Sequence, residues 1–169
     1  MFESLVKDFE KYHKLLDANQ LASMCGAFGE QILCEAFGWD KIDADGYDAI
    51  APIYQSVGGV SMPDKKIGEV KVEIKTMSGF TATNVLAYSS SAKAGKYDYL
   101  AIYMYHENRA AVIPHDELEE LLSKPNTGKT VNLNPTPKMV FGRQTDTIVY
   151  SPLTELFLKY EVKNFQRYE

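Results

Sequence analysis

Hydrophobic positions follow helical spacing through the N-terminal part of the chain. Between residues 3 and 17, apolar side chains recur every three or four positions, which is typical of an amphipathic helix lying on a core. The stretch from 20 to 37 is apolar almost all round, and Gly38 follows it as a C-terminal stop. The pattern therefore predicts two consecutive helices, of which the second is largely buried.

Past this point the pattern changes to the alternation of β-strands. The sequence "IDADGYDAIAPIY" predicts a turn leading into a short apolar strand, and "SVGGVSMPDKK" has the Gly and Pro content of a loop. The next stretch, "IGEVKVEIKT", alternates charged and β-branched residues. Residues 47–76 are therefore expected to form a long hairpin. The aromatic and nearly continuous apolar run "YDYLAIYMY" predicts a strand in the interior of a sheet.

The remaining segments alternate short strands and helices. A loop leading into a helix over residues 84–94 is expected within "SGFTATNVLAYSSSAKAG", and "HEN" predicts a tight turn into a strand at "RAAVI". "PHDELEELLSK" carries Pro and acidic residues where a helix begins. A polar loop at "PNTGKTVNLNPTPK", an edge strand or hairpin at "MVFGRQTDTIVY" and a final helix at "PLTELFLKYEVKNF" follow. This order predicts an α/β fold, a mixed central β-sheet flanked by α-helices, in a single domain spanning residues 1–169.

Composition and charge narrow the class of protein. With 169 residues, 45% of them hydrophobic and 24% charged, the chain suits one soluble globular domain. No apolar run reaches the roughly 18 residues that a membrane span needs, and the N-terminus carries acidic residues and lacks the apolar core of a signal peptide. We therefore expect a cytoplasmic protein without membrane contact. The net charge of −5 argues against a protein that simply coats nucleic acid, but not against one that holds metal beside it.

The two cysteines, Cys25 and Cys34, fall within the second predicted helix. A spacing of nine residues places them on opposite sides of a helix, so they could not bond to each other. Free buried thiols are therefore expected. With no cysteine pair at finger spacing and three scattered histidines, a zinc site is not expected.

The stretch "EVKVEIKT" gives one strand an entirely charged face. Its charged residues Glu69, Lys71, Glu73 and Lys75 alternate with Val70, Val72 and Ile74. One interpretation is a solvated strand with cross-strand charge pairs. The other is a strand that holds metal beside a phosphodiester.

Together, "GYDAI" and the later "VEIKT" resemble the PD-(D/E)XK nuclease superfamily, which has the restriction-endonuclease-like fold. The resemblance covers roughly residues 25–115 in the order of elements, and the small homodimeric type II restriction enzymes are nearest in size and layout. It implies that Asp48 and Glu73 bind Mg²⁺, for which Mn²⁺ can substitute, and that Lys75 assists the attacking water. It also implies that Glu30, in "GAFGEQIL", supports this catalytic site from the preceding helix.

The chemistry gives an independent reason for these residue types. Hydrolysis of a phosphodiester develops negative charge on phosphate oxygens and on the leaving oxygen, and carboxylates on two adjacent strands can hold Mg²⁺ against that charge. Glu73 and Lys75 are two positions apart, so they project from one face of a strand. The Lys ammonium can then stabilise a hydroxide or bind the scissile phosphate.

Alternatives exist for each acidic position. Glu69-Val70-Lys71 is a second Glu-X-Lys on the same face, which would move the site by two residues. Asp48 begins an apolar strand and ranks first among the aspartates; Asp64 follows, in a literal "PD" whose composition is that of a loop tip, and Asp45 ranks third, as a turn residue before Gly. Glu30 on a largely apolar helix needs a partner, because burying a lone carboxylate is costly. That partner is a metal, the catalytic Lys or a structural hydrogen bond, unless Glu30 lies on an exposed strip.

The function expected from these features is a Mg²⁺-dependent endodeoxyribonuclease acting on double-stranded DNA as a homodimer, with restriction as its role. A structure-selective nuclease such as a Holliday junction resolvase is the first alternative. A non-catalytic DNA- or protein-binding domain of the same fold is the second. Basic residues in predicted loops or near the site are expected to contact the DNA backbone: Lys65, Lys66, Lys71, Lys93 and Lys96, with Lys129 and Arg143 as further candidates.

Overall fold

The computed structural model describes residues 2–57, 60–77, 86–89, 96–105, 107–122, 130–133, 138–140, 147–149 and 152–165. At its centre lies a five-stranded sheet with the strand order β1-β2-β3-β5-β6. Strands β3 and β5 pair in parallel and the other neighbours are antiparallel. The bounds are β1 Asp40–Ala44, β2 Tyr47–Val57, β3 Val60–Met77, β5 Tyr99–Met104 and β6 Arg109–Pro114.

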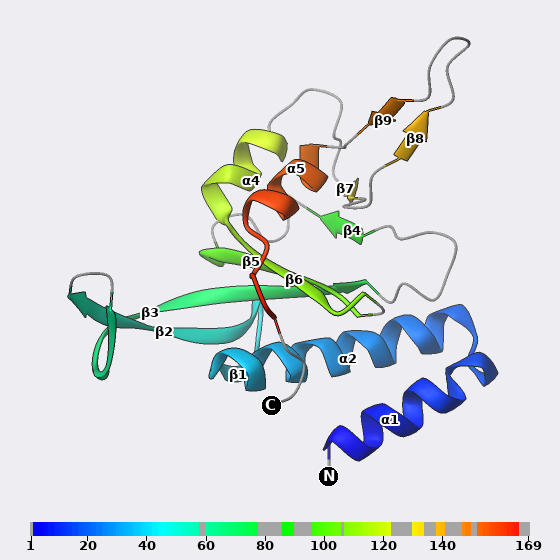
Figure 1. Cartoon of the computed structure of the whole chain (residues 1–169), viewed down its shortest axis with the longest axis horizontal. Coiled ribbons are helices and arrows are strands. Elements are labelled where there is room, and N and C mark those ends of the chain that lie inside the picture. Colours follow the sequence, from blue (N-terminus) through cyan, green and yellow to red (C-terminus); the bar gives the residue numbers. More distant parts are fainter. Residues whose placement is uncertain are drawn as a thin grey trace.

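Helices cover both faces of this sheet, as Figure 1 shows. One face carries α1 (Phe2–Tyr12), the 3₁₀ turn η1 (His13–Leu15) and α2 (Ala18–Phe37). The opposite face carries α4 (His115–Leu122) and α5 (Pro152–Lys159). The predicted α/β class, a mixed sheet flanked by helices, is confirmed.

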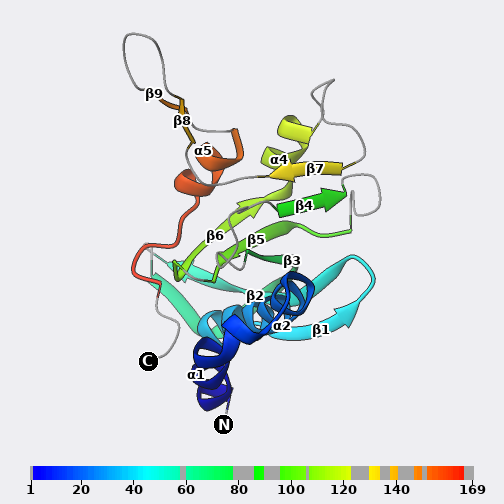
Figure 2. The same cartoon turned by 90° about the vertical axis from the view of Figure 1, so that its right-hand side faces the viewer.

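Two small antiparallel sheets accompany the central one. Strand β4 (Leu86–Ser89) pairs with β7 (Thr130–Leu133), on the same side of the main sheet as α4 (Figure 2). Strand β8 (Lys138–Val140) pairs with β9 (Thr147–Val149), so "MVFGRQTDTIVY" forms the hairpin that was one of its two predicted states.

Helix α2 is fixed at both ends by its sequence. The Asp17 carboxylate accepts hydrogen bonds from the amides of Asn19 and Gln20 at 2.9 Å each, and the Gln20 side chain accepts one from the Asp17 amide. At the other end Gly38 adopts φ 65°, the left-handed conformation that ends helices. The helix therefore begins two residues before its predicted start and ends where predicted.

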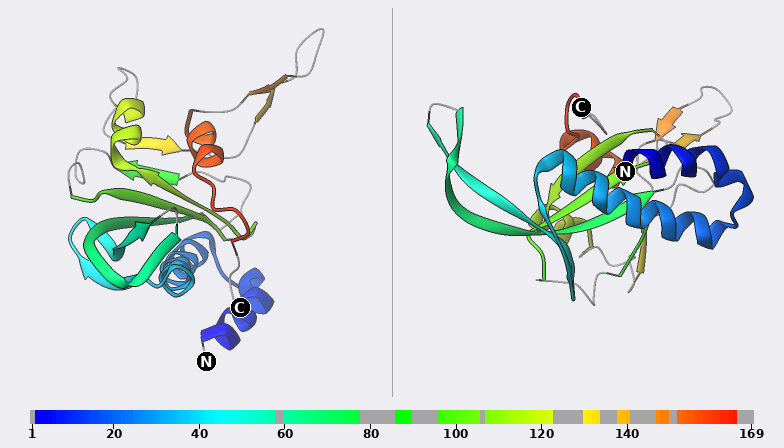
Figure 3. Two further views of the ribbon diagram at one scale, coloured as in Figure 1. Left: turned by 60° about the vertical axis from the view of Figure 1, so that its left-hand side comes forward. Right: turned by 90° about the horizontal axis from the view of Figure 1, so that it is seen from below.

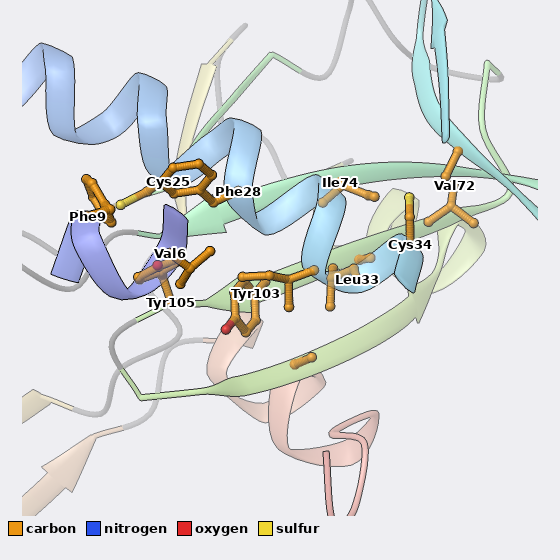
Figure 4. Packing of buried hydrophobic residues seen from close by; sticks show 14 of the residues in the cluster. Val6, Phe9, Cys25, Phe28, Leu33, Cys34, Val72, Ile74, Tyr103 and Tyr105 are labelled. Carbon is orange, nitrogen blue, oxygen red and sulfur yellow. The ribbon is translucent and has the colours of Figure 1, made fainter. Parts of the chain in front are cut away.

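The core of the protein lies largely between α2 and the sheet. Figure 4 shows Leu33 and Cys34 of α2 near Val72 and Ile74 of β3, and all four are buried. Neither cysteine forms a disulfide and both are buried, as predicted. Because α2 is apolar on nearly every side, it packs against the sheet on one side and against α1 on another (Figure 3). Within the described ranges, no helix combines the length and apolarity needed to cross a membrane.

Several sequence predictions are wrong. The loop expected at "SVGGVSMPDKK" belongs largely to β2 and β3, which pair with each other from Val57 and Val60 and form an arm beyond the other strands (Figure 1). Of the helix expected over 84–94, residues 86–89 form a strand instead, and the rest lies outside the described residues. Strand β1 was missed, because "IDADG" was interpreted only as a turn. Strand β7 was missed within a predicted polar loop.

The C-terminal helix is also shorter than predicted. Helix α5 ends at Lys159, and Glu161 forms a β-bridge with Ala111 of β6. Arg109 holds Glu161 with two hydrogen bonds, of 2.7 and 3.1 Å. Phe165 then packs against Phe37 of α2, with ring centroids 5.6 Å apart, so the tail connects the two faces of the sheet.

Candidate active site

The hairpin of β2 and β3 brings together an aspartate, a glutamate and a lysine. Ala49 pairs with Val72 in the antiparallel ladder, which places the neighbouring Asp48 beside Glu73. The Asp48 carboxylate accepts a hydrogen bond of 2.7 Å from the amide of Ile74. The backbone of β3 thus anchors Asp48 at the start of β2.

The charged face of β3 is solvated only at one end. Val72 and Ile74 point into the core beneath α2, so Glu73 and Lys75 lie on the opposite face. Glu69 and Lys71 are exposed, whereas Glu73 is completely buried. The interpretation as a solvated strand therefore holds around Glu69 and fails at Glu73.

The Lys75 ammonium lies among several oxygen atoms at the buried end of the charged face of β3. Its ammonium forms an ion pair with the Glu73 carboxylate, and it donates a hydrogen bond of 3.0 Å to the backbone carbonyl of Ile74. The Asp48 carboxylate lies 4.0 Å from the same nitrogen. One cation is thus surrounded by two carboxylates and a carbonyl. The Glu73 side chain is completely buried, so this ion pair lies away from water at its carboxylate end.

These oxygen atoms suit a hard divalent cation. Mg²⁺ prefers carboxylate and carbonyl oxygens and retains several waters, so the oxygens around the Lys75 ammonium are of the kind that could hold it. In the part of the chain that the structure describes, no three His, Cys, Asp or Glu side chains gather as a metal site. Asp48 and Glu73 would be the carboxylate ligands, and Mg²⁺ at phosphate sites commonly has only one or two from the protein.

The electrostatics of Asp48 agree with a site that favours added positive charge. Burial raises the pKa of the Asp48 carboxyl, and the charge of Glu73 raises it further. The hydrogen bond from the Ile74 amide and the charge of Lys75 lower that pKa. Burial has the largest influence on the pKa of Asp48, because it destabilises the ionised carboxylate. A bound cation would reduce this destabilisation.

Glu30 has a partner that the sequence analysis did not identify. Its carboxylate lies 3.0 Å from the ammonium of Lys41, on the missed strand β1. Of the partners considered for Glu30, a structural polar contact is therefore the one observed. Glu35 on the same helix accepts a hydrogen bond from Gln31. The Asp-Gly pair at Asp45 was the available signal for β1, because this dipeptide commonly joins two hairpin strands.

The structure separates the three candidate aspartates. Asp64 lies within β3 itself, nine residues before Glu73, which corresponds to about 30 Å along a strand. Asp45 is a turn residue, as predicted, and pairs with Lys96 at 2.6 Å. Only Asp48 among these three is placed next to Glu73 and Lys75.

The predicted DNA-contacting lysines whose side chains the structure describes each contact a neighbouring residue. Lys66 pairs with Glu69, and the Lys71 ammonium lies 5.2 Å from the centre of the Tyr47 ring. Lys96 pairs with Asp45 near the turn between β1 and β2. The predictions for the Lys65 side chain and for Lys93, Lys129 and Arg143 concern positions outside the described part of the chain.

Gly29 allows α2 to pack closely against β3. A Cβ atom at Gly29 would lie 1.9 Å from Oγ1 of Thr76 and 2.8 Å from its Cβ, closer than real contacts allow. Thr76 directly follows Lys75, and Glu30 directly follows Gly29. The absence of a side chain at Gly29 therefore lets α2 approach the end of β3.

We expect Gly29→Ala and Gly26→Ala to change stability in opposite directions. Gly29→Ala should destabilise the fold by about 1–3 kcal/mol, because the added methyl group overpacks against Thr76. At Gly26 nothing lies within 4 Å of the added Cβ, so alanine should stabilise the helix by about 0.5–1 kcal/mol. Chemical denaturation of the two variants measures both. Equal effects of one sign would show that α2 and β3 do not approach at Gly29.

Comparisons with known proteins find a likeness to solved structures. No family model matches the chain, and no curated protein matches it. Among solved structures, a bacterial homing endonuclease, I-Ssp6803I, is similar over 74% of this chain and 80% of its own, with 19% identity and a TM-score of 0.39. A likeness with this identity and TM-score does not bear on activity.

Proposed function

We propose that this protein is a metal-dependent endonuclease that hydrolyses phosphodiester bonds in double-stranded DNA. The observation that carries the proposal is the position of the Lys75 ammonium among the oxygens of Asp48, Glu73 and Ile74. A structural ion pair needs only one carboxylate for each ammonium. Two carboxylates from adjacent strands, one of them completely buried, form an acidic site with a capacity for further positive charge.

The proposed roles follow from what each group contacts. Asp48 and Glu73 would hold Mg²⁺, or Mn²⁺ in its place, and a bound cation would neutralise the negative charge that develops on the phosphate. Lys75 would turn from these carboxylates toward the attacking water, where its positive charge stabilises a hydroxide. Glu30, which pairs with Lys41, would support the site through its negative charge, which is among those that act on Asp48.

We further propose that the enzyme restricts foreign DNA and acts as a homodimer. Cutting two antiparallel strands is simplest with two equivalent sites related by a two-fold axis. Helices α1 and α2 are the proposed interface, because Leu5, Tyr12 and Leu15 are more than half exposed along α1 and η1. Sedimentation at micromolar concentration should give twice the mass of the chain; a monomer that cuts both strands in one encounter contradicts the dimer.

Incubation with plasmid, linear and branched DNA tests the function. Discrete fragments formed only with Mg²⁺ or Mn²⁺ are expected for a restriction enzyme, and cleavage confined to branched DNA would indicate a resolvase. Glu73→Gln protein, prepared in parallel, controls for contaminating nucleases. DNA binding without cleavage under any metal condition would favour a non-catalytic domain of this fold over the proposed enzyme.

A further inference from the structure

Strands β2 and β3 continue as a two-stranded arm beyond the rest of the central sheet. Among the described strands, β1 pairs with β2 as far as Ile50, and β5 pairs with β3 from Val72 onward. The arm consists of residues 51–57 of β2 and 60–71 of β3, which pair with each other. Figures 1 and 3 show it projecting away from the helices that cover the sheet. Neither β1 nor β5 therefore covers its outer edges.

A β-bulge at Ile67 redirects side chains of the arm. Ile53 pairs with Gly68 and Tyr54 pairs with Lys66, so Ile67 is an extra residue on β3. Ile67 is 66% exposed and Tyr54 39%, and the Lys66 side chain is 47% exposed. An aromatic ring, an ammonium group and an aliphatic side chain are thus presented to solvent at neighbouring positions of the arm.

The arm continues the strand face that carries the candidate site. Glu69, Lys71 and Glu73 alternate along β3 and therefore project from one face. The Lys66 ammonium pairs with the Glu69 carboxylate, so it lies on this face as well. The seven positions from Lys66 to Glu73 correspond to about 20 Å along a strand, the length of about six base pairs. DNA that reaches the site along this face would therefore pass the arm.

The form and chemistry of the arm suit a groove of DNA. A two-stranded hairpin is only marginally stable in water, and open strand edges favour contact with another molecule. The major groove of B-DNA is about 12 Å wide and admits a two-stranded β-ribbon. A lysine can bond to guanine there, and an aliphatic side chain can contact the methyl group of thymine. Because Glu69 balances the charge of Lys66, base edges fit this surface better than phosphates alone.

We propose that the arm enters the major groove of the DNA beside the candidate site and selects the sequence at which the enzyme acts. The inference rests on the proposed function, because it takes duplex DNA as the substrate. Tyr54, Lys66 and Ile67 are the contacting residues, and they read bases about six base pairs from the scissile bond. The strands that hold Asp48 and Glu73 thus extend into the element that determines specificity.

Binding of a DNA duplex in chelator tests the arm separately from cleavage. Tyr54→Ala, Lys66→Gln and Ile67→Ser should each weaken the affinity at least about fivefold, as the loss of a base contact does. Bulky groups on C5 of the pyrimidines fill the major groove. They should weaken binding by the wild-type protein at least about tenfold and binding by the triple variant less than about twofold. Denaturant midpoints should stay unchanged, because the three side chains are exposed.

Helix α5 offers matched controls. Lys159 pairs with Glu117 at 2.7 Å, much as Lys66 pairs with Glu69, and Leu158 is an exposed aliphatic residue. Lys159→Gln and Leu158→Ser should therefore leave the affinity for the duplex unchanged.

The contrary outcomes separate this inference from the nuclease proposal. Wild-type affinity in the triple variant overturns the inference, and a halved mass in sedimentation would then show that the arm contacts a second copy of the chain. Equal weakening of the wild-type protein and the triple variant by the bulky groups overturns it as well. If the wild-type protein binds the duplex but cuts no DNA with metal, the nuclease proposal fails while these affinities still decide the role of the arm. If it binds no duplex, both proposals fail.

Discussion

Glu73→Gln is expected to abolish DNA cleavage and leave the protein folded. The substitution keeps nearly the same volume at a completely buried position, so packing should survive, but it removes a negative ligand from the proposed cation site. Asp48→Asn should have the same effect, because the amide oxygen can still accept the hydrogen bond from Ile74. A plasmid cleavage assay with saturating Mg²⁺ measures the loss.

DNA binding separates a catalytic loss from a binding loss. Both variants should bind a duplex as well as the parent protein or more tightly, because each removes a negative charge that faces phosphates. Glu69→Gln is the matched control on the same strand face, where the side chain is exposed and paired with Lys66. If Glu69→Gln abolishes cleavage while Glu73→Gln does not, the site lies two residues earlier. Full activity in all three variants would remove the nuclease proposal for this strand.

Much of the fold could be predicted because its signals are local. The two N-terminal helices follow from apolar spacing and from Gly38, and the hairpin of residues 47–76 follows from alternation. Alternation also assigned Glu73 and Lys75 to one strand face and Val72 and Ile74 to the other. These inferences need only the period of a helix or strand, which does not depend on distant parts of the chain.

The burial of the charged face of β3 could not be predicted, because it depends on segments that are distant in the sequence. The amide of Lys71 donates to the carboxylate of Asp98 at 2.7 Å, and Tyr97 is buried on the same side of the sheet as Met77. Such packing makes one end of the charged face a buried acidic site and leaves the other end in water. The sequence alone therefore left both interpretations of "EVKVEIKT" open, and each describes one end of it.

Turn residues proved a poor guide to strand length. Gly and Pro in "SVGGVSMPDKK" predicted a loop, but most of this stretch belongs to β2 and β3, and Ser56 pairs with Ser61 and Val57 with Val60. Hydrogen bonds to a partner strand outweighed the local preference, as tertiary context often does. The same difficulty concealed β1, and with it Lys41, which is the partner of Glu30.

Lys75→Met is expected to destabilise the metal-free protein by about 3 kcal/mol, because it leaves the buried Glu73 carboxylate without its cation. Glu73 is completely buried, so this end of the charged face belongs to the protein interior and its substitution affects folding. Combining Lys75→Met with Glu73→Gln should recover most of the lost free energy of unfolding, because the buried negative charge is then removed as well. Denaturant titration in chelator compares the Lys75→Met, Glu73→Gln and double variants.

Divalent cations should restore much of the stability that the Lys75→Met variant loses. An ion bound by the native state alone stabilises it by about 2.7 kcal/mol at a hundredfold excess over Kd, and it would replace the missing ammonium among the same oxygens. The gain on adding Mg²⁺ or Ca²⁺ should therefore be larger for Lys75→Met than for wild type, where the ammonium competes. Cleavage should remain about 10² to 10³ slower even with metal, because the cationic helper is gone. If metal stabilises neither protein, Asp48 and Glu73 do not form a cation site, and the ion pair with Lys75 is structural.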